Sequence, residues 1–282
     1  MSEICDRPLN RQGRAGRGMT LVSGPLAGQA SAMQPPVLTV ATYNVQKGIG
    51  TDFRRDPHRT ARVIATLGAD IVALQEADRR FGQRRGVLDT AALAAETGLL
   101  PVDVPQRLGG AAHGWHGNIL LVRAARIEAV HVLHLPGPDP RGALVADLEM
   151  AGLGPLRVIA AHLSLLASAR QRQARLLAEL ATDADRPVIA LGDMNEWRRW
   201  PSRSLAALDE QLGPPGMAAS FPAPFPRLAL DRIYAGQGLE LLGAAVHDTP
   251  LARRSSDHLP VVARVRAATR SADAPPDAAK DG

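Results

Sequence analysis

The feature that most constrains this chain is a short aliphatic run that ends in polar side chains. Residues 188–191 follow Pro187 and are broken by Gly192, after which come Asp193 and Asn195. A short apolar run between turn signals is typical of a buried strand. Polar residues just beyond the end of such a strand lie where α/β sheets bind their ligands. The stretch therefore predicts a strand that delivers a carboxylate and an amide to the edge of a sheet.

Other apolar runs have polar side chains at their edges in the same way. These residues are Asn44 after VLTVATY, Glu76 after DIVALQ, His162 after LRVIAA, Asp231 before RIY, and Asp257 and His258 before LPVVARV. Burying a carboxylate is costly unless it is paired or binds a metal. Each position by itself also fits a turn residue, a helix cap or a hydrogen-bonded histidine. Six such placements in one chain favour a shared site.

Helical and extended patterns alternate along the chain. Cap and periodicity signals predict helices at residues 56–67, 89–97, 168–180 and 201–208, with Asp56 as the N-cap of the first. Strands are expected at residues 37–43, 70–75, 118–123, 127–133, 143–149, 156–162, 188–191, 228–234, 239–246 and 260–266. The middle of the chain is rich in largely antiparallel strands. The pattern predicts an α/β (α+β) domain of two sheets packed face to face with helices outside.

The two ends of the chain show neither helical nor strand periodicity. Residues 1–36 and 267–282 are expected to be disordered, which leaves one domain at residues 37–266. The leading segment has a basic start and a small-residue ASA, so export is an alternative to the cytoplasmic location that we expect. Its apolar stretch, LVSGPLAG, is short and interrupted by Gly and Pro, which argues against a signal peptide. Met33 directly precedes the first strand and is an alternative start, as is Met19.

Composition excludes several classes of protein. The single cysteine, Cys5, rules out an intrachain disulfide framework and a cysteine-based metal site. No apolar run is long enough to cross a membrane as a helix. A net charge of +5 suits an anionic partner, although arginine-rich coding alone would also produce it. We expect a monomer.

The chemistry that the polar residues support is that of a hard cation. Carboxylate and amide oxygens suit Mg²⁺ or Mn²⁺, for which Glu76 and Asp257 are the natural ligands. Asp193 is expected to take a proton from water, with Asn195 orienting that water or a phosphate oxygen. Asp231 paired with His258 would give an imidazole that neutralises charge developing on phosphorus, and His162 offers a second donor.

The motifs TYN, LQE, HLS, LGDMNE, LDRIY and SDHLP occur in this order between residues 37 and 266, and together they resemble the endonuclease/exonuclease/phosphatase superfamily. The resemblance implies a DNase I-like four-layer α/β sandwich that hydrolyses phosphoesters with Mg²⁺. It implies Glu76 as the principal metal ligand, with Asn44 and Asp257 nearby. Asp193 matches the residue that activates water. The other implied roles are phosphate contact for Asn195, scissile-phosphate binding for Asp231 and His258, leaving-group assistance for His162, and substrate contact for Arg141.

The chain departs from the family pattern at two places. Many members have a tyrosine near the phosphate, where this chain has GWHGNIL. The phosphate is then held by His116, by Asn118 or by an arginine, and we expect Asn118. Some nucleases carry an acidic residue where this chain has Gln46, which leaves open whether one metal binds or two.

Arginines follow or precede several motifs, at residues 79, 80, 84, 85, 198, 199, 253 and 254. They either recruit a polyanion or anionic head group, or are simply solvated. The segment SFPAPFPRLALDRIY beside Asp231 is either a rigid filler or a wall for an apolar part of the substrate. We expect a phosphodiesterase acting on nucleic acid, on a phospholipid or on a small phosphodiester. The alternatives are a phosphomonoesterase acting on a phosphorylated small molecule, and a non-catalytic binder of phosphorylated ligands.

Overall fold

Two six-stranded sheets form the centre of the fold in the computed structural model, which describes residues 36–79 and 82–268. The first sheet has the order β11 (Leu239–Val246), β12 (Val261–Ala267), β1 (Val37–Asn44), β2 (Ile71–Gln75), β4 (Ile119–Val122), β3 (Leu100–Pro101). The second has the order β5 (Ala125–Leu135), β6 (Arg141–Met150), β7 (Gly154–His162), β8 (Val188–Asp193), β10 (Asp231–Ala235), β9 (Gly216–Met217). Most of the two predicted tails, Cys5, Met19, Met33 and Arg80 lie outside the described residues.

Each sheet has one parallel pair of neighbouring strands, and its other described pairs are antiparallel. The parallel pairs are β1 with β2 and β7 with β8. Since parallel strands need a crossover connection, helices join them. The helix α1 (Pro57–Ala65) connects β1 to β2, and α3 (Ala167–Thr182) connects β7 to β8. The prediction of largely antiparallel sheets is confirmed.

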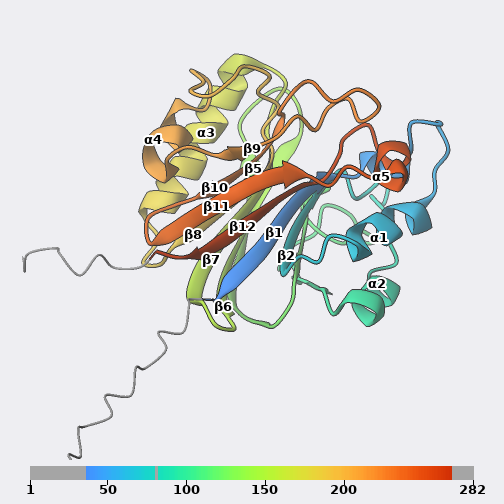
Figure 1. The fold of residues 1–282 in the computed structure, drawn as a ribbon, viewed down its shortest axis with the longest axis horizontal. Coiled ribbons are helices and arrows are strands. Elements are labelled where there is room, and N and C mark those ends of the chain that lie inside the picture. Colours follow the sequence, from blue (N-terminus) through green and yellow to red (C-terminus); the bar gives the residue numbers. More distant parts are fainter. Residues whose placement is uncertain (1–35, 80–81, 269–282) are drawn as a thin grey trace, which may run out of the picture. The chain divides into compact units, whose positions relative to one another are not determined.

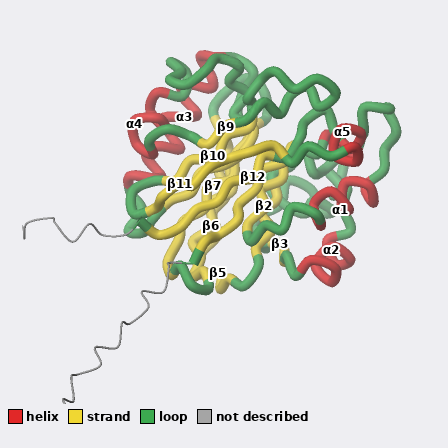
Figure 2. The backbone as a smooth tube through the Cα atoms, in the orientation of Figure 1, coloured by secondary structure: helices red, strands yellow, loops and turns green. Residues whose placement is uncertain are grey.

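Helices cover the outer face of each sheet, so the fold has four layers (Figures 1 and 2). The helices α1 and α2 (Thr90–Thr97) lie on the first sheet, where Val63, Ile64 and Leu93 pack against strand residues. The helices α3 and α4 (Ala206–Leu212) cover the second sheet. A separate apolar core fills the space between the two sheets. Strand residues therefore alternate between an inter-sheet core and a helix-facing core, as period-two packing requires.

The helix boundaries agree with the cap signals in the sequence. The Asp56 carboxylate accepts a hydrogen bond from the Arg59 backbone NH at 3.0 Å, as predicted for the N-cap of α1. Asp89 caps α2 in the same way, and Gly98 ends that helix with a φ of 72°. Among the described residues, no helix is long and apolar enough to cross a membrane.

Several boundaries and several short elements differ from the sequence prediction. The helix expected at 201–208 begins only at Ala206, because the side chain of Ser204 bonds to Glu196 and holds the preceding residues in a turn. The strand expected at 228–234 begins at Asp231, because Leu228 pairs with Phe221 in a local bridge. Strand β12 extends to Ala267. The prediction missed β3, β9, the 3₁₀ turn Gln46–Gly48 and the helix α5 (Pro250–Ser255).

Candidate active site

The polar residues predicted at strand edges meet at one end of the two sheets. In the parallel pairs, Asn44 lies opposite Gln75, next to Glu76, and His162 lies opposite Asp193. Asp231 begins β10 and also lies opposite Asp193. The two sheets are joined here by a hydrogen bond of 3.0 Å from Asn44 Nδ2 to Asp193 Oδ2. Parallel strands end at the same edge, and this edge carries the candidate site.

The Asp193 carboxylate is buried and held in place by several donors. Its Oδ1 accepts a hydrogen bond from the Asn195 backbone NH at 3.0 Å, and its Oδ2 accepts the one from Asn44. His162 Nε2 lies 3.3 Å from the same Oδ2. The side-chain amide of Asn195 donates to the Leu163 carbonyl at 2.8 Å, which ties the two strand ends together. These contacts fix the orientation of a buried carboxylate whose described salt-bridge partners are histidines.

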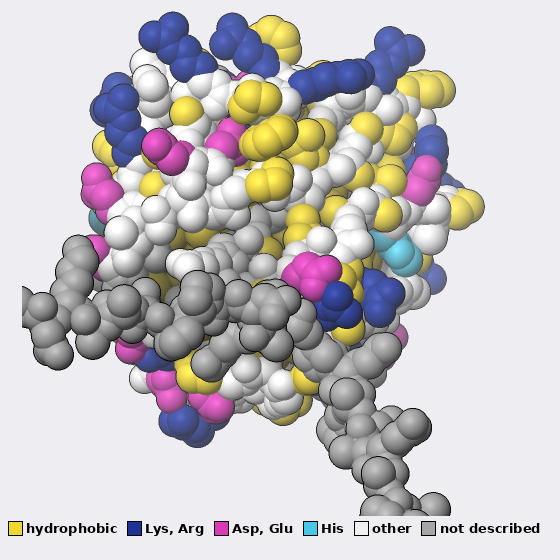
Figure 3. All heavy atoms as spheres, turned by 60° about the vertical axis from the view of Figure 1, so that its left-hand side comes forward, with side chains coloured by type: hydrophobic (Ala, Val, Ile, Leu, Met, Phe, Trp, Pro, Cys, Tyr) yellow, Lys and Arg dark blue, Asp and Glu magenta, His cyan; other side chains and the backbone are white. Residues whose placement is uncertain are grey.

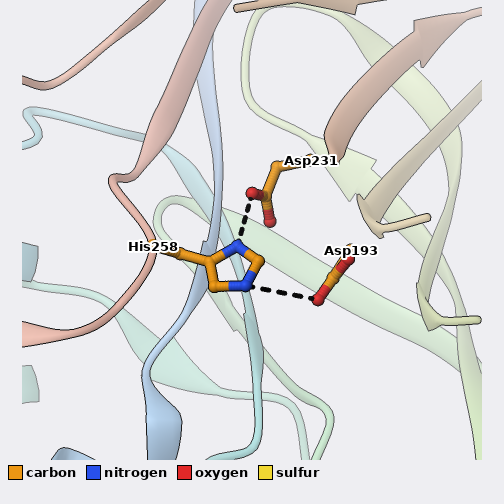
Figure 4. Close-up of side chains that lie close together, drawn as sticks. All are labelled: Asp193, Asp231 and His258. Carbon is orange, nitrogen blue, oxygen red and sulfur yellow. Dashed lines mark hydrogen bonds and ion pairs between the residues drawn. The ribbon is translucent and has the colours of Figure 1, made fainter. Parts of the chain in front are cut away.

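His258 lies between two carboxylates (Figure 4). Its Nδ1 is 2.8 Å from Asp231 Oδ2, and its Nε2 is 3.8 Å from Asp193 Oδ2. Asp231 is fully buried and accepts a second hydrogen bond from Ser220 at 2.5 Å. Burial opposes protonation of the imidazole, but the nearby Asp231 and Asp193 outweigh it and raise the pKa of His258 to about 10. His258 is therefore an imidazolium at neutral pH.

The pKa of His162 is shifted in the opposite direction from that of His258. Burial lowers the pKa of His162 to about 3, and Arg141 and His258 add to the effect while Asp193 opposes it. The Arg141 Nη1 lies 2.8 Å from His162 Nε2, and its Nε donates to Asp139 at 2.9 Å. The site thus contains one charged and one neutral imidazole, both next to Asp193.

Glu76 and Asp257 supply oxygen ligands suited to a hard cation. The Lys47 ammonium forms an ion pair with the Glu76 carboxylate, so a positive group already occupies that position. Burial raises the pKa of Asp257; His258 opposes this and Glu76 adds to it, as expected for two neighbouring carboxylates. The Asn44 Oδ1 accepts a hydrogen bond from the Gln46 backbone NH at 3.1 Å. The donor set of carboxylate and amide oxygens fits Mg²⁺ or Mn²⁺.

A second group of possible ligands lies beside the first. Asp193, Asp231 and His258 offer ligand atoms that all lie within 4.8 Å of one another, and this is the one such trio among the described residues. Both nitrogens of His258 already face carboxylates in this trio. Because a protonated imidazole cannot bind a metal, the trio fits a charged hydrogen-bonding relay better than an ion site.

Backbone conformation at the site is unusual. Eight non-glycine residues in the described part of the chain have positive φ, and six of them are at or beside the site: Gln46, Lys47, Glu76, Arg84, His116 and Asn195. A positive φ is unfavourable for an L-residue, and residues held there cluster at functional sites. The positive φ at these turns sets the direction of the side chains beside the site.

A pocket opens beside His162. Its lining residues are Lys47, Glu76, Asp78, Arg84, His116, Pro140, Arg141 and His162. Asn118, expected to bind phosphate, does not line it: the side chain is fully buried and donates to the Trp115 and Gly142 carbonyls at 3.0 Å. Both tyrosines of the chain are fully buried in strands, as expected. His116, the alternative to Asn118, lies at the pocket.

Sequence reasoning missed three polar residues that contribute to this region. Lys47 and Asp78 each lie within three residues of a predicted motif, which was the available signal. Asp78 is buried and receives two hydrogen bonds from Arg84, at 2.9 and 3.1 Å. Ser220 opens the segment SFPAPFPRLALDRIY, but only the tertiary structure shows that it contacts Asp231.

The arginines that flank the motifs differ in their surroundings. Arg84 lines the pocket, whereas the Arg253 side chain donates hydrogen bonds to Asp248 and to the Pro224 carbonyl. The Phe221 ring packs against His258 with centroids 4.9 Å apart, and Phe225 is exposed to solvent. The segment therefore supports the imidazolium from one side.

Comparison with known proteins agrees with the fold. Residues 41–258 match the Endonuclease/Exonuclease/phosphatase family. A protein of Escherichia coli (strain K12) with the name "Uncharacterized protein YbhP" is 31% identical over 248 residues, covering 80% of this chain and 95% of that protein.

Two solved structures share the fold. The endonuclease/exonuclease/phosphatase from Beutenbergia cavernae DSM 12333 has a TM-score of 0.62 and 23% identity, covering 82% of this chain and 72% of that chain. The endonuclease/exonuclease/phosphatase from Bacteroides vulgatus has a TM-score of 0.65 and 16% identity, covering 83% of this chain and 100% of that chain. The resemblance seen in the motifs is confirmed: this chain belongs to the endonuclease/exonuclease/phosphatase family.

Proposed function

We propose that this chain is a Mg²⁺- or Mn²⁺-dependent phosphodiesterase in which water attacks phosphorus. The observation that carries the proposal is the position of His258 between the Asp231 and Asp193 carboxylates, next to a pocket with cationic side chains. A buried imidazolium beside an oriented carboxylate combines a donor for an oxyanion with an acceptor for a proton.

Asp193 acts as the general base. The Asn195 backbone NH and the Asn44 side chain each donate a hydrogen bond to one of its oxygens. These bonds fix the orientation of the carboxylate, which can still accept a proton from water. We assign to the Asn195 side chain the role of positioning that water or a phosphate oxygen.

His258 stabilises the negative charge that develops on the phosphoryl oxygens. Asp231 holds Nδ1, so the proton on Nε2 is available to the substrate. His162 is neutral and hydrogen-bonded to Arg141, and we assign the pair to the leaving group and to substrate binding, respectively. His116, which lines the pocket, replaces Asn118 as our candidate for phosphate contact.

Glu76 and Asp257 would hold the metal ion, with Asn44 close by. When bound, the ion supplies Lewis-acid polarisation of the phosphoryl group. Lys47 would have to move away from Glu76, since both cations need the same carboxylate.

A phosphodiester is favoured over a phosphomonoester by the charge of the pocket. Each cation that lines it is paired with a carboxylate: Lys47 with Glu76, Arg84 with Asp78, and Arg141 with Asp139. A diester carries one negative charge and a monoester close to two, so side-chain cations that are already paired offer less to the second charge of a monoester. Nucleic acid, phospholipid and small phosphodiester all carry this group.

The test compares bis-p-nitrophenyl phosphate with p-nitrophenyl phosphate, in Mg²⁺, in Mn²⁺ and in excess chelator. We expect metal-dependent release of nitrophenol from the diester, and losses of about 10²–10⁴-fold in Asp193→Asn and His258→Ala. Asp185→Asn and His131→Ala, at exposed positions away from the site, serve as matched controls.

Retention of wild-type rates in both site variants would reject the mechanism. Faster hydrolysis of the monoester would support the phosphomonoesterase instead. If phosphate analogues bind but no phosphoester in the panel is hydrolysed, the chain is a non-catalytic binder.

A further inference from the structure

Large apolar side chains are exposed around the mouth of the site. The structure describes nine exposed large hydrophobic residues, and six of them lie on loops at the catalytic end of the sheets. They are Leu165, Leu166, Trp197, Trp200, Phe53 and Phe225, and the last two are 92% and 75% exposed. Exposed apolar residues scattered singly need no explanation, but a concentration at one end does.

The first four of these residues form one group, which we call the tryptophan group. Leu165 and Leu166 follow β7 and His162, while Trp197 and Trp200 follow β8 and Asp193. The buried Arg170 joins the two loops by donating to the Leu165 carbonyl at 3.1 Å and to the Glu196 carboxylate at 3.3 Å. The four side chains are therefore exposed on loops that the buried Arg170 side chain holds together.

Phe53 and Phe225 form the second group, which we call the phenylalanine group. The Thr51 backbone NH donates to the Arg254 carbonyl at 3.2 Å, which attaches the loop of Phe53 to α5. The Arg253 side chain donates to the Pro224 carbonyl at 2.7 Å, which attaches the loop of Phe225 to the same helix. Three segments distant in sequence thus form one surface.

Both groups lie on loops next to segments that carry candidate catalytic residues. The tryptophan group extends from the strand ends that carry His162 and Asp193. The phenylalanine group extends from the loop that leads into Asp231 and from the helix that precedes His258. A flat apolar surface in contact with both groups would therefore lie at the end of the sheets that carries the candidate site.

Positive charge accompanies these side chains. Arg198 and Arg199 are exposed between the two tryptophans, and the Arg254 side chain is 69% exposed beside the loop of Phe53. Figure 3 shows basic side chains along the upper edge of one face, with apolar side chains gathered just below them. Tryptophan beside basic residues is the composition found at membrane–water interfaces.

We propose that the two groups together dock this chain on the surface of an anionic lipid membrane, so that the site faces the phosphoesters of the head groups. The inference deepens the proposed function by naming the lipid surface as the place where substrate is presented. Aliphatic Leu165 and Leu166 insert among lipid chains but cannot stack on bases. One face of Trp197 lies beneath the Arg198 guanidinium, 5.5 Å from the ring centroid, so that face is not open for a base of a single-stranded nucleic acid to stack on.

Intrinsic fluorescence measures the docking directly. Of the three tryptophans in the chain, Trp115 is buried and bonded to the Leu133 carbonyl, so changes on binding come from Trp197 and Trp200. The Asp193→Asn protein is titrated with phosphatidylcholine vesicles, with and without phosphatidylglycerol. We expect a blue shift and binding that is stronger with the anionic lipid and weaker at high salt.

Two variants keep both fluorescent reporters and locate the surface. Phe225→Ser and Leu165→Ser are each expected to weaken partitioning about 10- to 150-fold, which corresponds to the roughly 1.5–3 kcal/mol of an inserted large apolar side chain. Leu100→Ser is the matched control. Leu100 is 60% exposed, and its partner Val122 lies opposite Ile71, at the end of β2 away from Glu76.

The outcomes separate the surface from the activity. Equal binding by Phe225→Ser and Leu100→Ser, no binding to anionic vesicles, or displacement of vesicles by a single-stranded oligonucleotide would each overturn the docking proposal. Hydrolysis of the soluble diester by wild type is measured in parallel. Vesicle binding without any hydrolysis would reject the proposed function and support the docking surface. Hydrolysis without vesicle binding would support the proposed function and reject the docking surface.

Discussion

Replacing Asp231 by asparagine is expected to confine catalysis to acidic pH. The Asp231 carboxylate is fully buried and accepts hydrogen bonds from His258 Nδ1 and Ser220 Oγ. It is the strongest of the groups that raise the pKa of His258, whereas burial lowers it. An amide of the same shape keeps the packing and removes the charge. The pKa of His258 should then fall to the ordinary imidazole value of about 6.5 or below.

The size of the effect follows from the protonated fraction. In the wild type, a pKa of about 10 keeps His258 charged at pH 8. With a pKa of about 6.5, only about 3% of the imidazole is protonated at that pH, which predicts a loss of at least about 30-fold. The loss shrinks as the pH falls through 6.5, because the variant regains its proton.

The same pair contributes to stability. The pKa of His258 is higher in the folded state than the unfolded value of about 6.5, so its stabilising effect is fully present below that pH. It is lost as the pH rises through about 10. Asp231→Asn should therefore lower the free energy of unfolding most at neutral pH and below.

The assay is the pH dependence of kcat/KM on the soluble diester, together with the NMR titration of the His258 ring. Asp147→Asn is the matched control, since Asp147 is also buried but pairs with Arg157 at the other end of the second sheet. It should lower stability without changing the shape of the profile. A wild-type His258 that titrates near 6.5, or an Asp231→Asn profile parallel to wild type, would refute the reasoning.

Two further predictions concern the same edge of the sheets. Lys47→Met removes the ammonium that occupies Glu76, and calorimetry should show Mg²⁺ binding strengthened by about fivefold or less, because a partly exposed ion pair contributes about 1 kcal/mol or less. Unchanged Mg²⁺ affinity would mean that Lys47 does not compete for the carboxylate. Gly192→Ala should cost about 1–3 kcal/mol or more in urea unfolding, since a Cβ at Gly192 would lie 1.8 Å from the Ala161 carbonyl oxygen. Full stability of that variant would show that β7 and β8 can separate without cost.

The sequence alone predicted most of the secondary structure because local patterns determine it. The strands that flank Asn44, Glu76 and Asp193 are short aliphatic runs, and the helix caps at Asp56 and Asp89 were legible from residue type. Boundaries failed where a distant side chain competes with the local pattern. Glu196 holds Ser204 in a turn before α4, and no neighbour in sequence reveals that contact.

The candidate site divides in the same way. The sequence determined which polar side chains stand at strand edges, because each edge is defined by the apolar run beside it. Only the tertiary structure decided that His116 rather than Asn118 lines the pocket. The turn at His116 sets the direction of its side chain, and the Asn118 side chain is buried.

Charge states and surfaces were also decided by the tertiary structure. His162 and His258 are the same residue type at similar strand edges, yet burial and Arg141 keep one neutral while Asp231 makes the other a cation. The exposed apolar groups around the mouth come from loops up to about 170 residues apart, joined by backbone carbonyls that any residue provides. Sequence determines what a strand presents at its end, and sheet register and burial determine what that side chain meets.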